Sequence, residues 1–221
     1  MSSLPSSAAT TAPRRQLADL GPIAQVRAGR LGRRFPQLII GLVLYGVSLA
    51  MMVRGALGLA PWDVLHSGIT GYVPLTLGQV VIVMSFVVLV AWIPLRETPG
   101  LGTVLNAILV GLAADATLAL LAEPDSVLFR ITLMIAGVVL NGLATALYIG
   151  AQFGRGPRDG LMTGLSRRTG LSLRLVRTCL EISVVLLGLV LGGVLGVGTL
   201  IYALGIGPLA QLMLPWCIVE L

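Results

Sequence analysis

The sequence contains no lysine, one histidine and two cysteines, and only 11% of its residues are charged. One histidine with Cys179 and Cys217 cannot supply a zinc-type metal site or a disulfide framework, so we interpret both thiols as small apolar filler. Catalytic patterns are also missing: there is no Ser-His-Asp set, no Walker loop and no paired acids in a polar segment. We therefore expect no enzyme activity, no metal and no cofactor.

The chain is instead rich in apolar residues. Of its 221 residues 56% are hydrophobic, and the mean hydropathy of +0.97 is typical of an integral membrane protein. All 15 basic residues are arginine, and they gather in an N-terminal arm and in one central loop. That distribution favours a bilayer over nucleic acid as the partner of this basic chain.

Six apolar stretches approach the length of about 20 residues that crosses a bilayer core. They are Phe35–Val53, Leu75–Leu95, Gly100–Ala122, Ile131–Gln152, Ser172–Leu195 and Val197–Trp216. Thr76 and Ser172 are suited to cap the second and fifth helices. We predict an all-α polytopic membrane protein with six transmembrane helices.

The arginines predict an orientation. If the N-terminus is cytoplasmic, 12 of the 15 arginines lie in cytoplasmic segments and only Arg54 and Arg130 lie outside. We expect both termini in the cytoplasm. Residues 1–34 begin with Ser, Ala, Thr and Pro and are expected to form a disordered cytoplasmic arm. They do not resemble a signal peptide, because no apolar stretch lies near the start.

The sequence matches itself when it is shifted by 96 residues. Between Gly41 and Ala114, 21 of 74 positions are identical to their shifted partners, whereas chance would give roughly one in ten. We expect a first repeat over residues 35–124 and a second over 125–221, each with three spans. Because three is odd, the second repeat would enter the membrane inverted, as in many secondary transporters.

A short segment follows the first span of each repeat. Gly58–Gly68 and Gly154–Gly164 share the pattern Gly-x-x-Pro-x-Asp. Glycine permits a tight turn, proline suits the first turn of a helix, and an acid there favours the helix dipole. These helices are too short to span and would be interfacial or re-entrant. Their N-termini offer N–H groups to an anion, but capped surface helices are the alternative.

Paired short helices point to a transport site. The candidate substrate-binding residues are Pro61, Asp63, Gly156, Pro157, Arg158, Asp159, Arg177 and Glu181.

Other polar residues fall inside the spans, where a charge costs about 2.5–3.5 kcal/mol. Arg177 and Glu181 lie one turn apart and can pair, either for coupling or as a structural pair near the cytoplasmic end. Asp115 would carry a proton or cation, or lie near the wet outer end. Asn106 and Asn141 are expected to hydrogen-bond between helices.

Three motifs carry a family resemblance: Gly-x-Gly-Pro-Arg-Asp-Gly-Leu-Met at 154–162, Val-Arg-x-x-x-Glu at 176–181 and Gly-Val-Gly-Thr at 196–199. With Pro61-Trp62-Asp63, they make residues 35–215 resemble the YczE branch of the YczE/YyaS/YitT membrane proteins. The resemblance implies a bacterial inner-membrane protein of a largely uncharacterised family that is suspected of transport.

These observations lead to two hypotheses. The first is a permease that binds a small polar or anionic solute between its two halves. The alternative is a non-transporting accessory or regulatory subunit that binds a cytoplasmic partner through the basic loop Arg155–Arg174. The small size of the chain also makes a homodimer an expectation.

Overall fold

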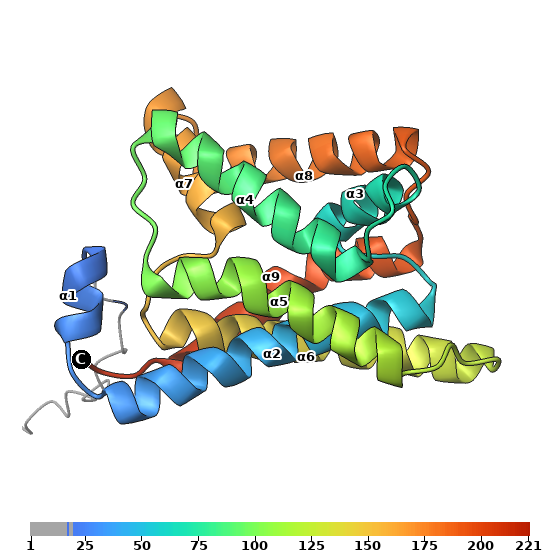
Figure 1. Ribbon diagram of the computed structural model, residues 1–221, viewed down its shortest axis with the longest axis horizontal. Coiled ribbons are helices and arrows are strands. Elements are labelled where there is room, and N and C mark those ends of the chain that lie inside the picture. The colour runs from blue at the N-terminus through green and yellow to red at the C-terminus, as the bar shows by residue number, and fades with distance from the viewer. Residues whose placement is uncertain (1–16, 18–19) are drawn as a thin grey trace, which may run out of the picture.

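The computed structural model describes residue 17 and residues 20–221, and all regular structure in that part of the chain is helical. Figure 1 shows how the helices are arranged. They are α1 (Pro22–Arg27), α2 (Leu31–Gly55), α3 (Pro61–Thr70), α4 (Leu77–Leu95), α5 (Leu101–Leu120), α6 (Val127–Gly150), α7 (Pro157–Thr169), α8 (Leu173–Val190) and α9 (Val197–Cys217).

Five of the described helices, α2, α4, α5, α6 and α9, are long and apolar enough to cross a membrane. The chain therefore has the composition and architecture of a polytopic helical membrane protein. The remaining expected span corresponds to α8, which has 18 residues and carries Arg174, Arg177 and Glu181. It is not one of the five candidates, so the sixth span stays a prediction.

The end of the expected disordered arm is ordered, which corrects the prediction for residues 20–34. This stretch contains α1 and the first turn of α2, and the Arg34 side chain is fully buried. The Arg34 guanidinium donates hydrogen bonds to the carbonyl oxygens of Gln25, Gly29, Ala151 and Gln152. The last two follow α6, where helix carbonyls lack partners within the helix. Residues 1–16, 18 and 19 lie outside the described residues.

Four helices of the first half begin 96 residues before four helices of the second half. The pairs are α2 with α6, α3 with α7, α4 with α8 and α5 with α9. The local causes of the helix starts repeat as well: α3 and α7 both begin with proline, and the predicted caps are confirmed at α4 and α8. There the Thr76 and Ser172 side chains accept hydrogen bonds from Gln79 N and Leu175 N.

The helices form two layers (Figure 1), with α2, α5, α6 and α9 in one and α3, α4, α7 and α8 in the other. In the first layer α2 packs on α6, α2 on α5, and α6 on α9. Gly41 lies against Ala144 and Tyr148, while Gly55 lies against Arg130 and Met134, so α2 and α6 run antiparallel. In the second layer α3 packs on α8 as α7 packs on α4.

Hydrogen bonds between the halves are also exchanged by the 96-residue shift. Gly102 N donates to Phe153 O at 2.8 Å, and Gly198 N donates to Leu57 O at 2.8 Å. The start of the last long helix in each half is therefore fixed on a loop of the other half. The largest departure from this symmetry is that α4 packs along α5, whereas α8 and α9 are not in comparable contact.

Candidate functional site

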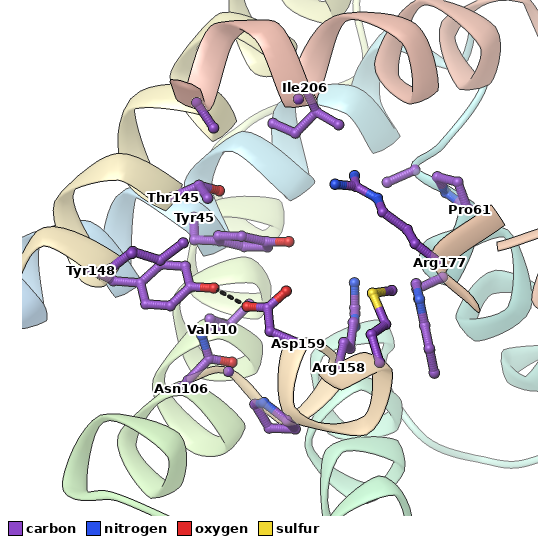
Figure 2. A pocket seen from close by; sticks show the side chains of 18 of the residues that line it. Tyr45, Pro61, Asn106, Val110, Thr145, Tyr148, Arg158, Asp159, Arg177 and Ile206 are labelled. Carbon is purple, nitrogen blue, oxygen red and sulfur yellow. Dashed lines mark hydrogen bonds between the residues drawn. The ribbon is translucent and has the colours of Figure 1, made fainter. Parts of the chain in front are cut away.

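A cavity of about 260 Å³ lies between the two layers and is lined by residues from α2 to α9 (Figure 2). Seven of the eight candidate substrate-binding residues line it: Pro61, Gly156, Pro157, Arg158, Asp159, Arg177 and Glu181. The eighth, Asp63, does not line the cavity but contacts Arg158. The structure thus brings together residues that are up to 120 positions apart in the sequence.

The two short helices begin at this cavity. Their first residues, Pro61 and Pro157, both line it. The loops that lead into them contain Gly58 at φ +121° and Gly154 at φ +113°, where a Cβ atom would lie 2.8 Å from Gly196 and 3.1 Å from Gly100. Only glycine permits both this backbone and this close approach, which explains the repeated glycine of the motif.

Arg158 extends from the first turn of α7 toward α3. Its Nη2 lies 3.5 Å from Oδ1 of Asp63, and its guanidinium lies 5.2 Å from the ring centre of Trp62. Asp63 is 4% exposed and accepts a hydrogen bond of 3.0 Å from Nδ1 of His66. The acid of the repeated motif therefore joins the two halves through an arginine that only the second half carries.

Neighbouring groups shift the pKa values of Asp63 and His66 on α3, which is not one of the spanning helices. Burial raises the pKa of the Asp63 carboxyl, but the His66 hydrogen bond and the Arg158 charge outweigh it and leave that pKa below its ordinary value. Burial lowers the pKa of His66, and the hydrogen bond to Asp63 only partly opposes this effect. His66 is therefore a neutral partner of an ionised Asp63 at neutral pH.

Arg177 and Glu181 form the expected pair, with 2.8 Å between Arg177 Nε and Glu181 Oε1. Both side chains also line the cavity, so the pair lies beside the other candidate residues. Both predicted roles of this pair, coupling to a solute and structural stabilisation of α8, stay predictions. The Glu181 contact uses Nε, so the Arg177 Nη groups can still donate to another acceptor.

Three tyrosines of the site were missed by sequence reasoning. Tyr45, Tyr148 and Tyr202 line the cavity, and the Tyr148 hydroxyl donates a hydrogen bond to Asp159. Figure 2 shows Tyr148 directed at this carboxylate. A usable signal existed: the chain has only four tyrosines, and three of them fall within predicted spans, where a phenolic hydroxyl needs a polar partner.

The remaining polar residues of the spans lie in different environments. Asn141 makes interhelical hydrogen bonds to Ser48 at 2.7 Å and Tyr202 at 3.0 Å, whereas Asn106 lines the cavity. Asp115 lies away from the cavity at the start of α4, where it accepts hydrogen bonds from Gly78 N and from the Thr76 hydroxyl. This geometry is that of a carboxylate that closes a helix N-terminus.

The basic loop uses much of its charge within the chain. Arg155 donates to the Thr163 hydroxyl, Arg168 donates to Pro94 O, and Arg167 donates to Leu95 O and pairs with Glu97. Arg155, Arg167 and Glu97 line a second hollow of about 750 Å³, which shares Ile149 and Asp159 with the cavity. In the part of the chain that the structure describes, no three His, Cys, Asp or Glu side chains lie close enough to hold a metal ion.

Comparisons with known proteins identify relatives but no activity. The model of the family of unknown function DUF6198 matches residues 32–215. An uncharacterised protein of Haemophilus influenzae is 41% identical over 177 residues, which are 80% of this chain and 81% of that protein. The uncharacterised membrane protein YczE of Bacillus subtilis is 31% identical over 79% of this chain and 82% of its own length.

YyaS, a further uncharacterised protein of Bacillus subtilis, is 28% identical over 80% of this chain and 90% of its own length. No solved structure matches the chain. The resemblance carried by the glycine-proline-aspartate motif, the α8 ion pair and the Gly-Val-Gly-Thr start of α9 is thus confirmed by a family match over residues 32–215. This protein belongs to the DUF6198 family, among membrane proteins that are similar to YczE and YyaS.

Proposed function

We propose that this protein is a small-solute permease whose binding site lies between two inverted repeats. The observation that carries the proposal is the cavity itself, which is lined by Arg158, Asp159, Arg177 and Glu181 between helices of both repeats. Charged side chains at membrane depth are costly and are retained mainly where they serve a pathway or a site. Secondary transporters commonly place such a site at the interface of their repeats.

The inverted arrangement is supported by the exchanged contacts. Each half contacts the other in the same way, so a two-fold rotation relates the two halves. Because α2 and α6 are partners under this rotation and run antiparallel, its axis crosses them instead of following them. If these helices span the bilayer, the axis lies in the membrane plane. The proposal includes α8 as the sixth span, since its counterpart α4 has spanning length.

The two hollows support alternating access. The larger hollow is bordered by Arg96, Arg155 and Arg167, on the side where the arginine distribution predicts the cytoplasm. It is separated from the cavity near Asp159, which lines both and is held by the Tyr148 hydroxyl. We propose that breaking this contact opens the cavity to the cytoplasm, and that both termini lie on that side.

The accessory-subunit alternative has weaker support. It needs the arginines of the central loop to face a partner, whereas Arg158 lines the cavity and Arg167 pairs with Glu97. One chain supplies all the residues that line the cavity, so the proposal does not require a homodimer. The homodimer stays a prediction.

Reconstitution into liposomes tests the permease. We expect saturable uptake of at least one small polar or anionic solute from a labelled panel, with loss of that uptake in Arg158→Gln. The matched control is Arg130→Gln, which removes an arginine that pairs with Glu123 outside the cavity. Flux equal to that of empty liposomes for the whole panel would reject the proposal, and so would full uptake by Arg158→Gln.

A further inference from the structure

One side of the cavity has hydrogen-bond donors for which the described residues supply no acceptor. Arg177 uses Nε for Glu181, and Arg158 makes one long contact of 3.5 Å with Asp63. Each guanidinium has five N–H donors, so both keep terminal N–H groups for an acceptor. Arg groups of this kind bind carboxylates and other planar oxyanions.

Trp62 adds an independent donor. This tryptophan lines the cavity, lies under the Arg158 guanidinium and is 7% exposed. Its indole N–H is buried and has no hydrogen-bond partner in the part of the chain that the structure describes, whereas the indole N–H of Trp92 donates to Pro157 O at 2.9 Å. A buried N–H without a partner loses its hydrogen bonds to water and gains none in return, which is unfavourable. An oxygen atom of a ligand would relieve that cost.

The other side of the cavity has a carboxylate without a cation. Asp159 accepts the Tyr148 hydroxyl, and among the described residues its carboxylate forms no ion pair, unlike Asp63 and Glu181. Figure 2 shows Tyr148 and Asp159 on one side of the pocket and Arg158 and Arg177 on the other. An ammonium group beside Asp159 would supply the missing charge.

The net charge of the site separates the ligand classes. At the cavity Arg158 and Arg177 are opposed by Asp159 and Glu181, and Asp63 contacts Arg158 from outside the lining, so these five groups together sum to −1 with His66 neutral. A free anion would add a second uncompensated negative charge to this site. A simple cation would leave the guanidinium and indole donors unused. A zwitterion serves both sides and leaves the net charge unchanged.

We propose that the cavity binds a small zwitterion, with its carboxylate at Arg158, Arg177 and Trp62 and its ammonium at Asp159. The proposal rests on the proposed function, since the same cavity is the solute site. A volume of about 260 Å³ is below the range of pockets for drug-sized ligands, so the ligand has the size of a single amino acid.

Two sets of matched probes test the proposal by calorimetry on the full chain in lipid nanodiscs. The first set is L-alanine, propionate, which lacks the amine, and ethylamine, which lacks the carboxylate. The second set is 4-aminobutyrate, butyrate and propylamine, in which the charges are farther apart. We expect at least one zwitterion to bind about tenfold or more tightly than both of its halves, because each half leaves charged partners unsatisfied.

Two variants assign the ends of the ligand. Asp159→Asn is expected to weaken zwitterion binding about tenfold without weakening the carboxylate probe, and Arg158→Gln to do the same without weakening the amine probe. Asp125→Asn and Arg130→Gln are the controls, since both side chains lie outside the cavity. Should a variant fail to fold, the comparison of probes on the unaltered chain still decides.

Three results would overturn the zwitterion: a carboxylate probe that binds as tightly as its zwitterion, an amine probe that does so, or no binding by any of the six probes to folded protein. The permease is tested apart from this. Zwitterion binding without flux in liposomes would reject transport and retain the site, while saturable flux of propionate without flux of alanine would retain transport and reject the zwitterion.

Discussion

Some polar side chains in this protein close helix ends and others face the cavity, and Arg34 belongs to the first group. It lies in a run of arginines that the sequence suggests is solvated, yet its guanidinium is fully buried against four carbonyl oxygens, which belong to α1, to the turn after α1 and to the residues that follow α6. The sequence offered no signal to separate it from Arg33, because charge runs are usually exposed and two of the four accepting carbonyls lie more than 100 residues away.

Arg34→Gln is expected to destabilise the protein by about 3–5 kcal/mol, because buried carbonyl groups lose a charged donor. The measurement is the apparent midpoint of thermal unfolding in detergent. Arg33→Gln is the matched control, since Arg33 is exposed and its replacement should change the midpoint little. Equal midpoints for the two variants would contradict the structural role of Arg34.

His66 predicts a pH dependence of stability. Its folded pKa is lowered, so the unfolded chain takes up a proton at higher pH than the folded chain does. Its contribution is therefore present above about pH 6.5 and is lost as the pH falls below that value. Asp63, whose pKa is also lowered, adds a loss in the same direction only below about pH 4.

The check is the unfolding midpoint between pH 7.5 and 5 for the unaltered chain and for His66→Gln. Glutamine keeps a donor for Asp63 but does not titrate. We expect a flatter pH profile in the variant, and a profile that is unchanged by the substitution would assign the pH dependence to other groups.

Among the helices, the start of α4 is closed by a residue of another helix. Asp115 of α5 accepts hydrogen bonds from Gly78 N at 2.8 Å and from Thr76 Oγ1 at 2.5 Å. The same acid was a candidate carrier of a proton or cation from the sequence. The two interpretations differ in what a neutral isostere would do, because asparagine retains an acceptor for Gly78 N but cannot carry a proton.

Asp115→Asn is expected to leave solute flux in liposomes unchanged and to lower stability by roughly 0.5–1 kcal/mol through loss of charge at the helix N-terminus. Asp115→Ala should cost about 1–3 kcal/mol, because Gly78 N then lacks its partner. Loss of flux in a stably folded Asp115→Asn protein would instead support a proton or cation role.

Helix positions were largely predictable from the sequence. Capping residues, prolines and glycines are local signals, so Thr76, Ser172 and Pro157 fixed the starts of α4, α8 and α7. Contacts between helices were less accessible. The hydrogen bond from Tyr148 to Asp159 depends on how α7 folds back on α6, and the contact of Arg158 with Asp63 joins positions 95 residues apart. Local patterns contain no information on such approaches.

For the whole molecule, the inverted arrangement predicts which loops face which side of the membrane. In a background without Cys179 and Cys217, cysteine is introduced at Asp125, Thr169, Val194 or Leu221. Asp125→Cys and Val194→Cys should react with a membrane-impermeant maleimide from outside intact cells. Thr169→Cys and Leu221→Cys should react only after the cells are opened.

Position 221 decides the status of α8. If α8 crosses the membrane, Leu221→Cys is protected in intact cells together with Thr169→Cys. If α8 does not cross, positions 169 and 194 lie on the same side of the membrane and position 221 lies on the opposite side. Equal labelling of Thr169→Cys and Val194→Cys would therefore contradict the sixth span.

The exchanged hydrogen bonds of Gly102 and Gly198 also mean that the first half is synthesised before its partner in the second half is available. The carbonyl that accepts from Gly102 belongs to Phe153, which leaves the ribosome 51 residues later. At about 5–20 residues per second, the first half waits roughly 3–10 s in the bilayer before its last helix gains this partner. A newly inserted first half thus lacks its contacts with the second half, and it is exposed to quality-control proteases until the ribosome has completed that second half.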